Sequence, residues 1–494
     1  MSQPCHIQSV NEAFRLARDQ FETMIYQLHN DPTAHMEHDQ VEALIKKLGT
    51  ELMRLLFQGH LHVRSKREKR MKSVEGSDGI VRTHCRENCE RNLMTEFGQV
   101  VVRRKGYSVR GVESLFPLDR ELNLPGGKYS SELCRLVAQD VSNSSFDEGV
   151  ENIASTTGAK IPKRQIIEQT VEMAQDFDAF YNLSGKPEET SDLLVITVDG
   201  KGIVMRREDL RPATRKAAEK QDDSHRARLG PGEKANRKRM ATVAAVYSIG
   251  AQERTPEQIM GPKEDKPVAV RAQNKRVWAS IEHDSRFVIK AAFEEALARD
   301  PTQSRHWVVV VDGGEQQLFD IIETARSYQA EITLVLDFIH VLEYLWKAAH
   351  CFHPVGSTQA EEWVKEKALQ VLQGEAKSVA ANLRRSATLQ QFAENRRKPV
   401  DKCADYLDKY LPMLEYDSFL SDGLPIASGV IEGACRHLIK DRLDRTGARW
   451  RLKSAEAIIR IRSLRSSGDF DAYWKFHRTQ ELQRDHSCRY ALAA

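Results

Sequence analysis

Three aspartates directly follow short apolar runs in the middle of the 494-residue chain. Asp199 ends LLVITVD, Asp312 ends WVVVVD and Asp337 ends ITLVLD. Runs of aliphatic residues without alternation are typical of strands that are buried on both faces. If these strands are parallel neighbours, their carboxyl ends meet at one sheet edge, where open α/β sheets bind ligands. We therefore expect a group of carboxylates at that edge.

Such carboxylates repel each other unless a cation or a shared proton lies between them, and oxygen ligands of this kind suit Mg²⁺ or Mn²⁺. Glu432 is the candidate third ligand, because its helix also carries Arg436, Lys440 and Arg442, which could hold a phosphate backbone. Each acid also has a structural interpretation: Asp-Gly starts turns, and a Glu near the start of a helix is favoured by the helix dipole. The combination favours a metal site.

His340 follows Asp337 by three residues and is expected at the start of the next helix, near the same edge. A phosphate contact or a positioning role is one interpretation, and a buried histidine with satisfied hydrogen bonds is the other. A structural zinc site at His84, Cys85 and Cys89 is disfavoured by their irregular spacing. The sequence contains neither a Walker A motif nor GxGxxG.

Composition and charge narrow the class of protein. With 40% hydrophobic and 29% charged residues the chain is typical of globular proteins. No apolar run approaches the roughly 20 residues of a membrane helix, no secretion signal is recognisable, and eight scattered cysteines do not suggest a disulfide framework, so we expect a cytoplasmic protein. Basic blocks at residues 63–72 and 436–465 indicate either a polyanion site or a solvated face.

Periodicity places the supporting elements. Residues 8–60 show the apolar spacing of amphipathic helix, and the charged stretch 61–90 is interpreted as a linker. The Val- and Tyr-rich stretch 98–111 predicts a β-hairpin that turns at Lys105-Gly106.

Further helices are expected on both sides of the acidic strands. Residues 145–175 predict two short helices, the first capped by Ser145 and the second opening with Lys163 and Arg164. This is the outline of a helix-turn-helix, although an ordinary helical hairpin has the same pattern. Residues 341–420 predict an all-helical unit.

The motifs VDGKG, VVVVDGG, LDFIHV and SGVIEGACRHLIKDR, followed by RTGARW, resemble bacterial insertion-sequence transposases of the Kra-type family, within the Mutator-like group of DDE transposases. The resemblance covers roughly residues 90–475. It implies an α/β fold with a ribonuclease-H-like mixed sheet core and an all-helical insertion, after a mostly helical DNA-binding region with a β-hairpin and a helix-turn-helix. The expected division is a helical region with a basic linker (1–90), the DNA-binding region (91–185), the first part of the core (186–340), the insertion (341–425) and the last part of the core (426–494).

The resemblance also implies the site. Asp199 lies on the first strand of that fold, Asp312 just after the fourth, and Glu432 on the last helix, and together they hold two Mg²⁺ or Mn²⁺ ions. Asp337 and His340 match an Asp/Cys-Xaa-Xaa-His motif of the group. Asp337 is therefore the rival for the second acid, and we prefer Asp312 because its strand should neighbour the first.

The function that the resemblance implies is recognition of terminal inverted repeats, followed by metal-dependent DNA cleavage and strand transfer into target DNA. A homo-oligomer, associated with the bacterial nucleoid, is expected. The alternatives are a DNA-binding regulator with a degenerate core, and a ribonuclease-H-like nuclease without strand transfer. The residues expected to contact DNA are Lys163, Arg164, Arg436, Lys440, Arg442, Arg449 and Trp450.

Overall fold

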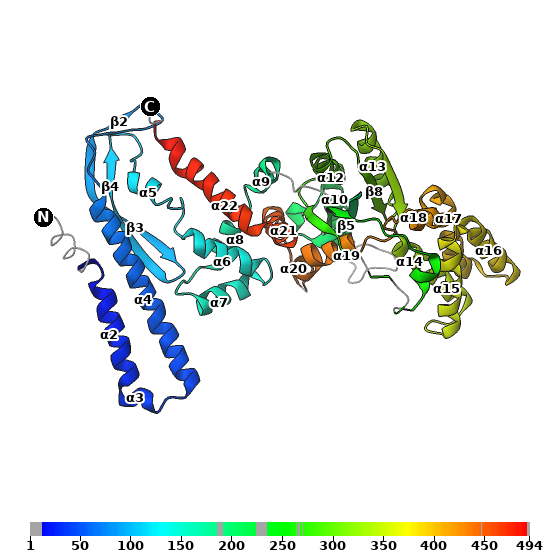
Figure 1. Ribbon diagram of the computed structural model, residues 1–494, viewed down its shortest axis with the longest axis horizontal. Coiled ribbons are helices and arrows are strands. Elements are labelled where there is room, and N and C mark those ends of the chain that lie inside the picture. The colour runs from blue at the N-terminus through cyan, green and yellow to red at the C-terminus, as the bar shows by residue number, and fades with distance from the viewer. Residues whose placement is uncertain are drawn as a thin grey trace. The chain divides into compact units, whose positions relative to one another are not determined.

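The chain folds into two compact units in the computed structural model (Figure 1). Unit 1 comprises Met1–Leu183 and Phe470–Ala494, and unit 2 comprises Ser184–Asp469. The stretch 426–494, expected to be one part of the core, is therefore shared between the units. No helix among the described residues is long and apolar enough to cross a membrane. The structure describes residues 12–184, 191–223, 235–262, 264, 267–268, 270–445 and 447–491.

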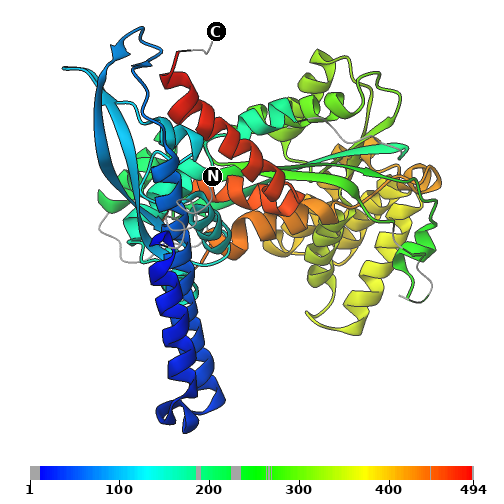
Figure 2. The same ribbon diagram turned by 60° about the vertical axis from the view of Figure 1, so that its left-hand side comes forward.

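A pair of antiparallel helices opens unit 1. α2 (Arg15–His29) and α4 (His38–Arg67) lie side by side and project from the rest of the unit, with α3 (Asp31–Ala34) at the tip (Figures 1 and 2). The amide of Gln58 on α4 exchanges hydrogen bonds of 2.8 and 2.9 Å with the backbone of Val101. These helices confirm the helical prediction over residues 12–60; residues 8–11 lie outside the described part.

The linker and the hairpin turn were predicted wrongly. Within 61–90, α4 continues to Arg67, and β1 (Val74–Glu75), β2 (Val81–Arg82) and the start of β3 (His84–Thr95) follow. β3 pairs with β4 (Gly98–Ser108), so the turn falls at residues 96–97. Gly106 lies inside β4 because the neighbouring ring of Phe116 leaves no room for a side chain: a Cβ there would lie 2.7 Å from that ring.

Three helices that contact one another follow: α6 (Ser131–Val141), α7 (Phe146–Thr156) and α8 (Lys163–Met173). Ser145 caps α7 as predicted, because its hydroxyl accepts the Glu148 N–H (3.1 Å) while the Glu148 carboxylate accepts the Ser145 N–H (2.6 Å). Residues 157–162 connect α7 and α8, a longer connection than the roughly 3–4 residues of a helix-turn-helix turn.

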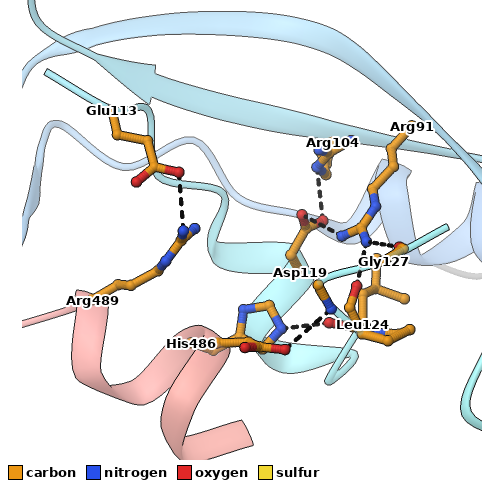
Figure 3. Close-up of polar contacts among 11 residues, drawn as sticks. Arg91, Arg104, Glu113, Asp119, Leu124, Gly127, His486 and Arg489 are labelled. Carbon is orange, nitrogen blue, oxygen red and sulfur yellow. Dashed lines mark hydrogen bonds and ion pairs between the residues drawn. The ribbon is translucent and has the colours of Figure 1, made fainter. Parts of the chain in front are cut away.

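The C-terminal segment completes unit 1. α22 (Phe470–Glu481) packs against α9 (Phe177–Leu183). The buried His477 on α22 forms a hydrogen bond of 2.6 Å through Nδ1 with the carboxylate of Asp176. Beyond α22, a π-helical turn (Leu482–His486) brings His486 to the carbonyl of Leu124, to which its Nε2 donates at 2.6 Å. Figure 3 shows this contact beside α5 (Pro117–Glu121).

A buried carboxylate lies at the centre of that region. Asp119 of α5 accepts Arg91 of β3 at 3.4 Å and pairs with Arg104 of β4 at 2.7 Å (Figure 3). Only 6% of Asp119 is exposed, so both guanidinium groups depend on one desolvated counter-charge. The nearby pair Glu113–Arg489 (3.0 Å) is largely exposed.

Unit 2 is built on a mixed five-stranded sheet of order β7-β6-β5-β8-β9. β5 is antiparallel to β6 and parallel to β8, and β8 is parallel to β9. α12 (Ser285–Arg299) packs on β5 and β6, and α21 (Leu452–Ser467) on β7. The strands are β5 (Leu193–Val204), β6 (Lys238–Ile249), β7 (Gln273–Ser280), β8 (His306–Val311) and β9 (Ile332–Leu336).

Helices connect and extend this sheet. The helices of residues 341–420 confirm the predicted all-helical unit, which begins with α14 (Phe338–Phe352) after β9. The stretch 428–443 is not one regular helix as expected, because a π-helical segment (Cys435–Lys440) separates α19 (Gly429–Ala434) from α20 (Asp441–Leu443). The remaining helices of unit 2 are α10 (Pro212–Asp223), α11 (Pro256–Met260), α13 (Glu315–Ser327), α14 (Phe338–Phe352), α15 (Thr358–Leu372), α16 (Ala376–Leu389), α17 (Glu394–Lys409) and α18 (Tyr416–Ser421).

We predict that Asp119→Asn lowers the free energy of unfolding by about 3 kcal/mol, because it leaves the buried Arg104 and the partly buried Arg91 without their shared counter-charge. Denaturant unfolding of the full chain measures this. Glu113→Gln is the matched control, and its exposed ion pair predicts a loss below about 1 kcal/mol. Equal losses in the two variants would contradict the central role of Asp119.

Candidate active site

The three aspartates lie just beyond the last pairs of the parallel strands, whose register, if continued, would bring them into one row. β5 pairs with β8 from Leu193 with His306 to Thr197 with Val310, and continuing this register by two residues places Asp199 beside Asp312. β8 pairs with β9 up to Val311 with Leu336, so the next position places Asp312 beside Asp337. Residues at the same level of adjacent strands lie about 4.8 Å apart. Asp312 is thus the middle member of the row.

The sequence suggested that Asp199 ends its strand, but the strand continues beyond it. β5 continues to Val204, paired with β6 throughout. Only the parallel pairing with β8 stops before Asp199, whose side chain is half-buried. The carboxylate therefore lies where one neighbouring strand has ended and the other continues, and it is held by a backbone that is paired on one side.

Tyrosines of the helical unit hold the strand ends beside this row. The hydroxyl of Tyr406 donates to the carbonyl of Asp312 at 2.9 Å, and that of Tyr410 donates to the carbonyl of Gly313. Tyr416 donates to the carbonyl of Leu336 at 2.7 Å. Burial raises the pKa of Tyr406, which keeps its hydroxyl protonated as a donor. These contacts fix the backbone from which Asp312 projects.

The carboxylate of Asp337 is buried and has a structural role, because it accepts hydrogen bonds from two neighbouring segments. It is 4% exposed, and its Oδ1 caps α14 by accepting the Ile339 N–H at 2.8 Å. Its Oδ2 accepts the N–H of Ser428 at 3.2 Å and also the Ser428 hydroxyl. Both carboxylate oxygens are therefore engaged, Oδ1 in capping α14 and Oδ2 in joining the end of β9 to the start of α19. This supports Asp312 as the partner of Asp199.

Glu432 lies on α19, which packs on β5 and β6. Its side chain is exposed. Cys435, one turn later, is buried and donates its thiol to Oδ2 of Asp199 at 3.0 Å. Burial and the charge of Asp199 raise the pKa of Cys435, so the thiol stays protonated. Sequence reasoning missed this contact, because a lone cysteine after Glu432 carries no motif.

The remaining sequence-predicted residue near the row is His340. It is half-buried on the first turn of α14, and its Nδ1 lies 4.0 Å from Glu343. Across the described ranges, no group of three His, Cys, Asp or Glu side chains is close enough together to hold a metal ion. The structure thus carries Asp199 and Asp312 just beyond the last pairs of two adjacent parallel strands and Glu432 on an adjoining helix, without assembling all three around one point.

The basic residues after Glu432 fall into two groups. Arg436, Lys440 and Arg449 are exposed, although Arg436 lies 3.7 Å from Asp441. Arg442 and Trp450 are buried, with the guanidinium 4.8 Å from the indole centre. These two side chains pack against each other in this structure, and their contact with DNA stays a prediction.

Arg462 of α21 supports the π-helical segment that carries Arg436 and Lys440. Its Nε donates to the carbonyls of His437 (2.8 Å) and Leu438 (3.1 Å). Burial lowers the pKa of the Arg462 guanidinium to about 10, which leaves it charged at neutral pH. Because Arg436 and Lys440 lie in π-helical geometry, the face that they share with Glu432 cannot be taken from a regular helical wheel.

The two cations predicted on the second helix of the helix-turn-helix are exposed in unit 1. Lys163 pairs with Asp147 at 2.6 Å, and Arg164 pairs with Glu168 at 2.8 Å. Exposed pairs of this kind contribute little to stability and can exchange for a phosphate.

Comparison with known proteins gives no family assignment. No family model matches the chain, and no curated protein matches it.

We predict that Asp337→Asn lowers the free energy of unfolding by about 2 kcal/mol, because a buried acceptor of several hydrogen bonds is lost. Asp312→Asn should change it by less than about 1 kcal/mol, because this half-buried side chain accepts only the Gly314 N–H (3.0 Å) among the hydrogen bonds of the described residues. Urea unfolding of the full chain compares them. A larger loss for Asp312→Asn would reverse our assignment of structural and chemical roles.

Proposed function

We propose that the chain is a DDE transposase of the Kra type, with a ribonuclease-H-like core, that binds the terminal inverted repeats of an insertion sequence and catalyses DNA cleavage and strand transfer. The observation that supports this best is the parallel pairing of β5 with β8, whose register, continued two residues beyond Thr197 with Val310, would bring Asp199 level with Asp312. The order β7-β6-β5-β8-β9 and the packing of α19 on β5 are consistent with it.

The donor atoms of the site suit hard divalent cations. Asp199, Asp312 and Glu432 supply only carboxylate oxygens, and two adjacent aspartates need a cation to offset their repulsion. These three residues would hold two Mg²⁺ or Mn²⁺ ions, which when bound activate water or a DNA 3′-hydroxyl and stabilise the leaving oxygen. The exposed side chain of Glu432 must turn towards the aspartates to join them.

Other residues of the chain orient the acids and the DNA. The thiol of Cys435 holds one oxygen of Asp199, and the Gly314 N–H holds one oxygen of Asp312 at 3.0 Å. The exposed cations Arg436, Lys440 and Arg449 offer a path for the phosphate backbone. In unit 1, α8 with Lys163 and Arg164 is the element that we assign to recognition of the DNA ends.

Two alternatives remain distinguishable by experiment. A regulator with a degenerate core would bind end DNA but would not cleave it with any metal. A nuclease without strand transfer would cleave it but would not join the freed 3′-hydroxyl to a second duplex. The row of aspartates favours an enzyme, since a regulator does not need carboxylates placed in register.

We predict that Asp199→Asn, Asp312→Asn and Glu432→Gln each reduce Mg²⁺-dependent cleavage of end-containing DNA by at least 1,000-fold (about 4 kcal/mol) while end binding stays within about threefold. Gel-based cleavage and joining assays measure this, and Asp441→Asn is the matched exposed control on the same stretch of helix. Near-normal cleavage by any of the three would remove that residue from the site.

We also predict that Arg436→Ala and Lys440→Ala each reduce the slope of log affinity against log salt by about one unit, almost independently of DNA sequence. Binding titrations at several salt concentrations measure the slope. Arg451→Ala is the control, since this exposed arginine lies 3.9 Å from Glu208. If the slope is unchanged in the double variant Arg436→Ala, Lys440→Ala, the two cations are only hydrated or paired with Asp441 and do not contact the DNA phosphates.

A further inference from the structure

A cavity of about 400 Å³ lies within unit 1, between early helices of the chain and its C-terminal segment. Residues of α6, α8, α22 and the π-helical turn after α22 form its wall. Glu172, Gln175 and Arg484 of this wall are exposed, so part of the wall belongs to the molecular surface. Cavities of this size hold small organic molecules.

Two buried side chains of the wall each have a polar atom without a hydrogen-bond partner. These atoms are Nε1 of Trp474 on α22 and Oε1 of Gln169 on α8, and no described residue pairs with either of them. The two residues are 5% and 7% exposed. Buried polar atoms without a partner are rare because they destabilise the fold. One atom is a donor and the other an acceptor, so a ligand that carries both functions can satisfy them.

The charges around the cavity are predominantly negative. The charged residues of the wall are Glu172, Glu481, Asp485, Arg484 and His477. Arg484 is already paired with Asp176 at 3.0 Å. With Asp176 and a protonated His477 both counted, four acids stand against two cations. The next charges, Glu168 beside Glu172 and Arg478 beside Glu481, offset each other. The cavity therefore favours a cationic ligand.

Glu481, at the end of α22, is a buried acid with little compensation for its charge. Its side chain is 19% exposed, and Nε2 of His477 lies 3.6 Å away. Because Nδ1 of His477 bonds Asp176, one imidazole is shared between two acids. Burial raises the pKa of Glu481, since its charged form loses hydration. An ammonium group in the cavity would supply the missing counter-charge.

The wall also determines what kind of cation fits. A metal ion is not favoured, because among the described residues no three His, Cys, Asp or Glu side chains are close enough together to hold one. Pro125, Met173 and the body of Trp474 offer apolar contacts to a hydrocarbon chain. A zwitterion such as an amino acid would add a carboxylate to a cavity that already has an excess of acids. A neutral hydroxyl accepts the indole N–H without this repulsion.

We propose that this cavity binds a small hydroxylated amine, an organic cation with one ammonium group and a neutral oxygen acceptor. The ammonium group lies beside Glu481 and donates to Oε1 of Gln169, and the Nε1–H of Trp474 donates to the oxygen of the ligand. Such a ligand joins α8 to α22 and stabilises unit 1. The site is independent of the proposed catalytic function.

The first test is calorimetric titration of the dialysed full chain with 5-amino-1-pentanol as the probe. We expect a dissociation constant below about 1 mM. Hexylamine replaces the hydroxyl by a methyl group, and 1-hexanol replaces the ammonium group by one. Each should bind at least about tenfold more weakly than 5-amino-1-pentanol, because each leaves one part of the site without its partner.

Variants of the full chain separate the two ends of the ligand. Trp474→Phe should weaken 5-amino-1-pentanol by about tenfold and leave hexylamine within about twofold, because hexylamine has no oxygen for the indole. Glu481→Gln should weaken both amines by at least about fivefold. Glu151→Gln, at an exposed position of α7 outside the wall, is the matched control and should change neither.

A second test needs no ligand. Gln169→Met keeps the size of the side chain and removes the unpaired oxygen, so it should raise the melting temperature of the dialysed chain by about 2 °C. Gln58→Met is the matched control, because the amide of Gln58 exchanges hydrogen bonds with the backbone of Val101. It should lower the melting temperature by a similar amount.

No heat of binding with 5-amino-1-pentanol at roughly 10 mM would overturn the proposal. Equal affinity for 1-hexanol would overturn it as well, since the cavity would then bind hydrocarbon alone. If Trp474→Phe weakens both amines equally, the indole N–H has no role in binding. A loss of melting temperature in Gln169→Met as large as in Gln58→Met would show that the oxygen is already paired, and would contradict the site.

Discussion

The site of unit 2 depends on the parallel pairing of three short strands. Hydrogen bonds fix β8 against β5 as far as Thr197 with Val310 and against β9 as far as Val311 with Leu336, and it is this register, continued past the last pairs, that would bring Asp199, Asp312 and Asp337 to one level. A slip of one residue would turn an aspartate to the opposite face of the sheet, because side chains alternate along a strand. Buried aliphatic side chains on both faces oppose such a slip, and the tyrosines of the helical unit hold the strand ends in place.

The same row assigns different environments to chemically identical residues. Asp337 is enclosed by hydrogen bonds from Ile339 and Ser428, whereas Asp312 lies half-buried just before the turn at Gly313 and Gly314. Gly313 adopts a φ of +88° with the ring of Tyr410 close by, which only glycine accepts readily. Position in the row, and not residue type, thus separates the carboxylate that holds the fold from the one that is available for chemistry.

How far the sequence predicts this arrangement differs between elements. The apolar runs predicted β5, β8 and β9 because strands buried on both faces need unbroken apolar side chains. The same rule missed β7, whose first half is polar and exposed, and the continuation of β5 beyond Asp199, where exposed residues return. Gly106 was taken for a turn residue, but packing of Phe116 requires it. The tyrosine contacts and the Cys435 thiol join residues far apart in sequence, and no local pattern encodes them.

Unit 1 contains both the early and the late parts of the chain, and this has a consequence for the order of synthesis. Asp176 emerges from the ribosome about 300 residues before His477 and Arg484, which bond it in the folded unit. Until then the buried carboxylate has neither partner, and Leu124 lacks the imidazole of His486. Unit 2 is therefore free to fold while unit 1 is still incomplete. Residues from Phe470 onward are translated after unit 2 and complete unit 1, so a product truncated before Phe470 would carry an intact sheet without a finished first unit.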